Sequence, residues 1–247
     1  MGRERLNEVL KRIEATVASK RLPMVVLDLD STLFSTAHRN LRILREFADE
    51  FADDYPRLRD HVNALGPRDM SWQVLDAVRA RGYDPSDLER RFRPYWMERF
   101  FTDAYVKDDH PNLGAVAFAN ACHERGALLY YLTGRHKGGM ELGTAQSLSM
   151  NGFPYWRGRA VLHLKPAFDM PDLEYKEHAV ADIRSYLSPV VATFENEPGN
   201  ANLFLRAFPD GLHFLLETEH SPEAESPDPK LIRIPDFRLP GGRKGHR

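Results

Sequence analysis

A chain of 247 residues with 42% hydrophobic side chains is long enough to bury a core, as one large domain or as a core domain with an insertion. Its 34 basic and 36 acidic residues give a formal net charge of −2, which excludes a general electrostatic attraction to nucleic acid or anionic lipid. The single cysteine, Cys122, excludes an intrachain disulfide and a cysteine-rich zinc site. No apolar run is long enough for a membrane span or a signal peptide. We therefore expect a cytoplasmic protein with no membrane partner.

The first expected elements are a helix and a strand. Apolar side chains recur at helical spacing between Leu6 and Val17, and the run from Met24 to Leu27 is typical of a short buried strand. Residues 35–109 then show helical patterns interrupted by Gly and Pro, and they contain no convincing strand. This segment indicates a helical insertion after the first strand.

Four helix-then-strand units follow the insertion. The expected strands lie at residues 127–132, 159–164, 189–194 and 211–216, each preceded by a helical pattern. Such an alternation predicts an α/β fold with a doubly wound, Rossmann-like parallel sheet and helices on both faces. Residues from 217 on are rich in Pro, Glu and Ser and predict an extended or disordered tail, although LIRIPDF within it could pack on the body.

Polar clusters stand where these strands end or where the next helix begins. DLDST follows the first strand, TGR (Thr133 to Arg135) follows ALLYYL, Lys176 lies at the start of a helix, and ENEPGN begins at Glu195. In a parallel sheet the carboxyl ends of the strands emerge at one edge, so residues far apart in the sequence can share one crevice. We expect the four clusters to form one site.

The clusters resemble, in order, the four motifs of the haloacid dehalogenase-like hydrolases, and in particular of phosphatases with an inserted helical cap. The matching positions are Asp28, Asp30 and Thr32 of the DxDxT motif, Leu132, Thr133 and Gly134 of the second motif, Lys176 of the third, and Glu195 to Glu197 of the acidic fourth motif. The resemblance covers residues 20–34 and 110–216. It implies a catalytic core of residues 1–34 and 110–216, an all-α cap at 35–109 and a tail at 217–247.

The resemblance implies a reaction through a phospho-aspartate. Asp28 attacks the phosphorus, because a carboxylate can form an acyl phosphate that water later hydrolyses. Asp30 protonates the leaving oxygen and then takes a proton from the attacking water. Thr133 donates its hydroxyl to a phosphoryl oxygen, and Lys176 neutralises charge on the nucleophile and on the transferring group. Family members that cleave carbon–halogen bonds lack an acid at the position of Asp30, which favours phosphate chemistry.

The resemblance also implies a magnesium ion, which offsets the repulsion between the nucleophile and the phosphate. Asp28, the backbone carbonyl of Asp30 and Glu195 would hold it, with Asn196 as a further candidate ligand. The family more often has an Asp pair or Gly-Asp in the fourth motif, so the choice among Glu195, Asn196 and Glu197 stays open.

Two further assignments complete the expected site. Lys176 is preferred over Lys165 as the lysine of the third motif, because a lysine that opens the helix leading into the acidic strand end matches the family arrangement. Thr32, Gly134 and Arg135 are expected to bind the substrate.

Each cluster also has a purely structural interpretation. DLDST alone is a common capped turn, TGR a strand exit with a glycine turn, Lys176 a solvated helix residue, and ENEPG an acidic loop before a helix. RRFRPYWMERFF interleaves arginine with aromatics, as some nucleic-acid-binding segments do, but its spacing favours an amphipathic cap helix.

Taken together, the sequence predicts a magnesium-dependent phosphatase whose cap excludes water and selects a small phosphorylated metabolite. Nucleic acid is not the expected partner. Two alternatives stay open: a phosphatase of nucleic-acid ends that uses the same motifs, and a module that binds phosphate or metal without turnover.

Overall fold

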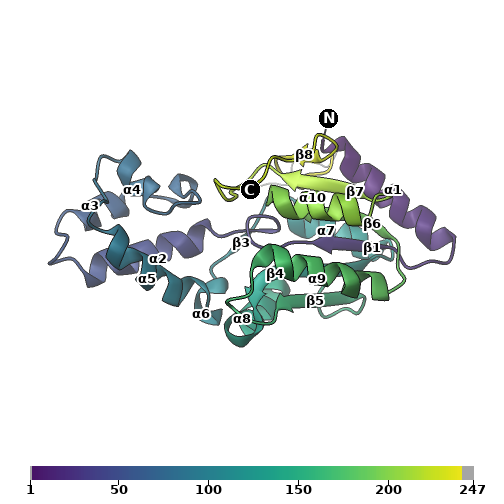
Figure 1. Cartoon of the computed structure of the whole chain (residues 1–247), viewed down its shortest axis with the longest axis horizontal. Helices are drawn as coiled ribbons and strands as arrows, with labels where there is room; N and C mark the ends of the chain where they lie inside the picture. Colours follow the sequence, from purple (N-terminus) through teal and green to yellow (C-terminus); the bar gives the residue numbers. More distant parts are fainter. Residues whose placement is uncertain (1, 241–247) are drawn as a thin grey trace.

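The core of the protein is one six-stranded parallel sheet. In the computed structural model, which describes residues 2–240, the strands follow the order β5-β4-β1-β6-β7-β8 (Figure 1). The strands are β1 (Met24–Leu27), β4 (Leu128–His136), β5 (Ala160–Lys165), β6 (Val190–Glu195), β7 (Leu212–Leu216) and β8 (Ile232–Ile234). The predicted doubly wound α/β fold is confirmed, and each strand expected after the insertion begins one position after its predicted start.

Helices cover both faces of this sheet. They are α1 (Glu4–Ala18), α7 (Ala115–Glu124), α8 (Lys137–Met150), α9 (Asp172–Ser185) and α10 (Pro198–Ala207). Alternate residues of β1 belong to different cores: Val25 and Leu27 pack with α1, α7 and α8, whereas Met24 and Val26 pack with α9 and α10. Because successive side chains of a strand point to opposite faces, a fully apolar strand of this kind fits a sheet that is buried on both sides. Within residues 2–240, no helix combines the length and the apolar character needed to cross a bilayer.

The direction of the chain changes at β1. From β1 the chain builds β4 and β5 on one side, then returns to build β6, β7 and β8 on the other. β1 pairs in parallel with both β4 and β6. Connections that leave a strand in opposite directions open a crevice outside its carboxyl end, which is where ligands bind in sheets of this type.

The helical insertion leaves and rejoins the core through a short two-stranded ladder. β2 (Phe34–Ser35) pairs antiparallel with β3 (His110–Pro111). The elements between them are α2 (Ala37–Glu50), α3 (Leu58–Asn63), the 3₁₀ helix Pro67–Asp69, α4 (Asp76–Ala80), α5 (Glu89–Phe100) and α6 (Asp103–Val106). These helices have a hydrophobic cluster of their own, in which Phe47 meets Phe92 and Tyr95 edge to face. Figure 1 shows them beyond the end of the sheet.

The expectation of an extended or disordered tail is corrected by the structure. β8 adds to the sheet beside β7, with Ile232 opposite Phe214, so LIRIPDF packs on the body. Phe237 is buried in the main core against Phe118 and Phe194. Gly114 lies at φ +81°, and a side chain there would approach the backbone of Phe237 to 2.6 Å. The apolar residues of the segment outweigh its polar composition, because they complete one face of the sheet. Residues 241–247 lie outside the described residues.

Phe237→Ala tests whether the tail contributes to the stability of the fold. Loss of a buried phenylalanine from a packed core lowers the free energy of unfolding by about 3–5 kcal/mol. Urea unfolding should show this loss, whereas Met150→Ala, at a side chain that is 82% exposed, should change the free energy little. Equal stabilities of the two variants would mean that the tail does not support the core in solution.

Candidate active site

All four sequence clusters meet at the carboxyl edge of the sheet. Asp28 and Asp30 follow β1, and Glu195 ends β6 beside it. The second cluster lies inside β4, which continues to His136 and shifts its pairing with β5 after Thr133. Lys176 reaches the same edge from α9. The predicted convergence of distant residues is what a parallel sheet requires, since its strands end together.

Lys176 connects the first and fourth clusters. Its ammonium group donates to Asp28 Oδ1 at 2.9 Å and to Glu195 Oε1, and all three side chains are buried. Burial lowers the pKa of Lys176, but the carboxylates of Asp28 and Glu195 outweigh it and raise the pKa well above its ordinary value. The alternative lysine, Lys165, ends β5 and lines the cavity described below.

Glu195 holds the lysine and the loop after β6. Its Oε1 accepts from Lys176, and its Oε2 accepts from the backbone N–H groups of Asn196 and Glu197 at 2.9 and 3.0 Å. Both oxygens of this buried carboxylate therefore already have donors. Its assignment as a metal ligand stays a prediction, and Asn196 and Glu197 are the fourth-motif residues that line the cavity.

Asp28 lies in a strongly negative environment. Burial raises its pKa most and Glu195 raises it further, while Lys176 lowers it, so that the pKa of Asp28 stands at about 8. Asp172 adds a further carboxylate 3.8 Å from the Lys176 ammonium. One lysine thus faces three carboxylates, an imbalance that a divalent cation would offset.

The side chains around Asp28 are oxygen donors, the ligand type that a magnesium ion prefers. Among residues 2–240 no three His, Cys, Asp or Glu side chains converge as a metal-binding group, so a cation here would depend on few carboxylates. Magnesium binds in that way, through one or two carboxylates, other oxygens and water. Asp28 and Asn196 line the cavity, and together with the backbone carbonyl of Asp30 they remain the predicted ligands of such an ion.

Three smaller residues shape the site. Thr32 is fully buried, and its hydroxyl donates to Asn196 Oδ1 at 3.2 Å, so it lies beneath the fourth-motif loop and not in the cavity lining. The hydroxyl of Thr133 accepts the backbone N–H of Arg135. Gly134 borders the cavity, and a side chain there would overlap the Asp172 carboxylate.

Arg135 lies in the site, but its guanidinium is committed to carboxylates. It is buried and donates to Asp30 Oδ1 through Nε, at 2.9 Å, and through Nη2. Two residues that the sequence analysis missed complete the group: Arg39 of α2 also donates to Asp30 Oδ1, and both arginines donate to the buried Asp109. Burial raises the pKa of Asp30, but Arg135 and Arg39 lower it more, to about 2. The role of Arg135 in substrate binding stays a prediction.

A cavity of about 1670 Å³ opens in front of these residues. Its walls come from the sheet edge, from the helical insertion through residues such as Trp72 and Phe101, and from the segment after β7. The last segment, residues 217–225, was placed outside the site by the sequence analysis. As an exit from a strand end it could have been expected at this edge, but nothing in its composition shows that it turns back over the cavity.

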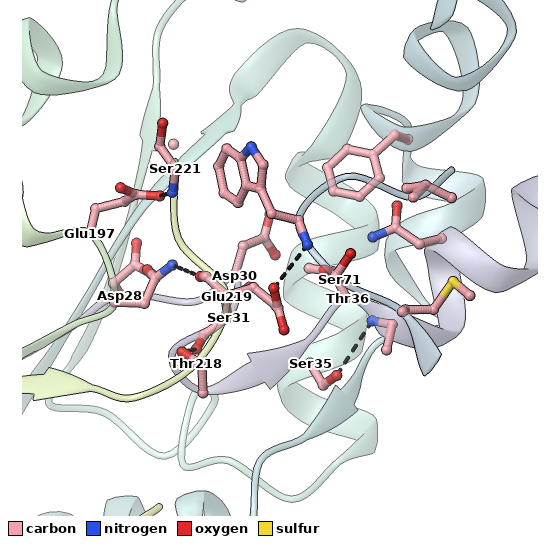
Figure 2. Close-up of a pocket in the computed structure, with 18 of the residues that line it drawn as sticks. Asp28, Asp30, Ser31, Ser35, Thr36, Ser71, Glu197, Thr218, Glu219 and Ser221 are labelled. Carbon is pink, nitrogen blue, oxygen red and sulfur yellow. Dashed lines mark hydrogen bonds between the residues drawn. The ribbon is translucent and has the colours of Figure 1, made fainter. Parts of the chain in front are cut away.

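Residues 217–225, which we call the strap, are fastened to the site at several points. Thr218 donates to the backbone carbonyl of Ser31, the carbonyl of Glu219 accepts from Asn196 at 2.6 Å, and Ser221 N–H donates to Glu197 at 2.9 Å (Figure 2). The Glu219 carboxylate also accepts the backbone N–H of Trp72, 2.8 Å away in the insertion. The strap therefore joins the carboxyl edge of the sheet to the helical insertion.

Solved structures of low sequence identity superpose on this chain. A putative phosphatase from Clostridium difficile superposes with a TM-score of 0.51 at 11% identity, covering 83% of this chain and 89% of that one. A putative haloacid dehalogenase-like hydrolase from Burkholderia xenovorans LB400 has a TM-score of 0.46 at 14% identity, covering 88% of this chain and 94% of that one. A class C acid phosphatase from Bacillus anthracis with tungstate bound has a TM-score of 0.42 at 14% identity, covering 81% of this chain but only 63% of that one. No family model and no curated protein matches the sequence. The superposition on the Clostridium difficile protein supports the expected α/β fold.

Lys176→Met tests the buried charge cluster. Removing the ammonium group leaves Asp28 and Glu195 buried without their shared partner, and breaking a buried pair in this way costs about 3–5 kcal/mol. Urea unfolding at neutral pH should show this loss, and Glu195→Gln in the same chain should recover part of it. Lys165→Met, at a partly exposed lysine, serves as the control and should change the stability little. Equal effects of the two lysine variants would contradict the structural role of Lys176.

Proposed function

We propose that the protein is a phosphoric monoester hydrolase that works through a phospho-aspartate at Asp28. The observation that carries this proposal is the placement of Asp28 at the floor of the cavity, with one carboxylate oxygen bound by Lys176 and a second acid, Asp30, facing the same space. The fold shared with the putative phosphatase from Clostridium difficile supports it.

In the first half-reaction, an oxygen of the ionised Asp28 forms a bond to phosphorus while the bond from phosphorus to the ester oxygen breaks. A bound cation would favour this ionised form by lowering the pKa of Asp28 from about 8. Lys176 lies on the nucleophile and offsets the negative charge that gathers there. With Asp30 ionised, as its pKa of about 2 implies, the departing oxygen leaves as an anion when the alcohol is acidic enough, and a less acidic alcohol needs the protonated form of Asp30. When bound, Mg²⁺ would offset the charges of the phosphate and of Asp28.

In the second half-reaction, water attacks the phosphorus of the phospho-aspartate, and Asp30 accepts its proton as the bond to Asp28 breaks. Inorganic phosphate and the free carboxylate of Asp28 result. The ionised form of Asp30, which Arg135 and Arg39 favour by lowering its pKa to about 2, is the form that this step needs. A phenolate leaves readily without a proton, and an aryl phosphate is therefore the first probe.

Asp28→Asn tests the nucleophile. The native chain should hydrolyse an aryl phosphate in the presence of Mg²⁺ and stop when the metal is chelated, and the variant should be slower by at least about a thousandfold because the amide is a poor nucleophile. Asp60→Asn, at an exposed position of α3, is the matched control and should keep full turnover. Turnover by Asp28→Asn, or turnover that survives chelation, would contradict the proposed mechanism.

We propose a small phosphorylated metabolite as the substrate. Asp28 is only 6% exposed, and the insertion and the strap stand on two sides of the cavity that leads to it. A phosphate on the surface of a folded protein would not reach this depth, whereas a free metabolite would.

A substrate panel separates this proposal from its alternatives. Small phosphate esters should be turned over, while folded phosphoproteins should not. Preferred turnover of 3′- or 5′-phosphorylated oligonucleotides, with binding that weakens steeply with salt, would indicate a nucleic-acid-end phosphatase instead. Binding of phosphate or Mg²⁺ with no turnover of any ester would indicate a binding module.

A further inference from the structure

The two oxygens of Asp30 have different surroundings. Oδ1 accepts from Arg39 Nη2 and Arg135 Nε, each at 2.9 Å, and from Arg135 Nη2. No hydrogen bond from the described residues reaches Oδ2, and the side chain is 32% exposed and lines the cavity. Oδ1 is therefore held by the two arginines, and Oδ2 is free to contact a substrate.

Arg39 is itself held rigidly. Its Nε and Nη2 grip the two oxygens of Asp109 at 2.9 and 2.6 Å, a bidentate arrangement that fixes the plane of the guanidinium. Nη1 donates to the carbonyl of Phe100 at 2.9 Å, and the phenyl ring stacks 4.0 Å from the guanidinium carbon. Arg39 and Asp109 have fully buried side chains. Because the Arg39 guanidinium is held by several contacts, it can fix the orientation of the Asp30 carboxylate that it binds.

The group also joins the insertion to the sheet. Asp30 follows β1 and Arg135 belongs to β4, while Arg39 lies in the first helix of the insertion and Asp109 lies directly before β3, where the chain returns. Both crossings between the insertion and the core therefore contribute a residue. The orientation of Asp30 therefore depends on the position of the insertion, which carries Arg39 and Asp109.

We propose that Arg39 is a positioning residue, which acts through Asp30 by holding Oδ1 so that Oδ2 faces the reacting phosphate. The inference rests on the proposed function for its catalytic consequence and on the contacts alone for the positioning. Arg39 does not line the cavity, so it acts without touching the substrate. The helical insertion thereby supplies part of the catalytic geometry in addition to a wall of the cavity.

A double-variant cycle tests the catalytic consequence. With an alkyl phosphate ester, whose departing oxygen needs a proton from Asp30, Arg39→Met should lower kcat by about 100-fold, as a misplaced catalytic group does, and change KM by less than about threefold. Because both changes act on one group, the variant carrying Arg39→Met and Asp30→Asn should be no slower than Asp30→Asn alone. Arg42→Met is the control, since Arg42 lies one turn along α2 and is paired with Asp108 and Glu46 at the surface. The proposal would be overturned if the rate losses of Arg39→Met and Asp30→Asn multiply in the double variant, or if Arg39→Met is as active as Arg42→Met.

Crystal structures of the native chain and of Arg39→Met test the positioning without requiring turnover. The proposal expects the Asp30 carboxylate to rotate or to occupy more than one orientation in the variant, and an unchanged orientation would overturn it. If Arg39→Met does not fold, Arg39→Lys can replace it in the experiment. A lysine keeps the charge but cannot make the bidentate contacts of the guanidinium, so the same displacement of Asp30 is expected. A native chain that hydrolyses no phosphate ester, together with a displaced Asp30 in the variant, would overturn the proposed function and support the positioning.

Discussion

The architecture of the site depends on one buried positive charge. Lys176 enters from α9 and meets Asp28 at the end of β1 and Glu195 at the end of β6, residues that are 148 and 19 positions away in the sequence. A charge taken out of water is costly unless it is paired and hydrogen-bonded, so these three groups hold one another in a narrow range of positions. α9 also packs on the sheet through apolar side chains such as Tyr175 and Ile183, so an apolar face and a buried charge together fix the position of Asp28.

A second buried charge group gives the two aspartates different properties. Asp28 and Asp30 are separated by one residue, yet carboxylates and burial raise the pKa of the first to about 8, while Arg135 and Arg39 lower the pKa of the second to about 2. The two environments give the same residue type different properties, and a cation bound at Asp28 would lower its pKa towards the ionised form that attack on phosphorus requires. In the proposed reaction, Asp28 bonds to phosphorus and Asp30 exchanges protons.

The cavity brings together three parts of the chain that are distant in the sequence. The sheet edge supplies its floor, the insertion a wall, and the strap a connection between them through Asn196, Glu219 and Trp72. Because the strap contacts both the fourth-motif loop and the insertion, its position and the shape of the cavity depend on each other. Selection of the substrate is accordingly expected to involve the strap as well as the cap.

Local pattern was enough to predict the scaffold and the residues at its edge. Apolar runs such as Met24 to Leu27, bounded by turn residues, determine where buried strands lie, and their alternation with helices implies a parallel sheet with its strand ends together. Asp28, Asp30 and Thr133 follow expected strands, and Lys176 lies near the start of an expected helix, so the amino-acid sequence alone assigned them to one edge of the sheet.

Only the tertiary structure decided the partners of those residues. Arg39 and Asp109 look like ordinary charged positions of a helix and a loop, and they join Asp30 only because the insertion leaves and returns beside β1. The tail is polar by composition, yet a few apolar side chains such as Phe237 are sufficient to return it to the core. The sequence by itself determined which segments form the sheet and which residues lie at its carboxyl edge, because periodicity and strand ends are local properties. The pairing of the buried charges and the walls of the cavity depend on contacts between segments that are distant in the sequence. A local sequence pattern does not contain such contacts.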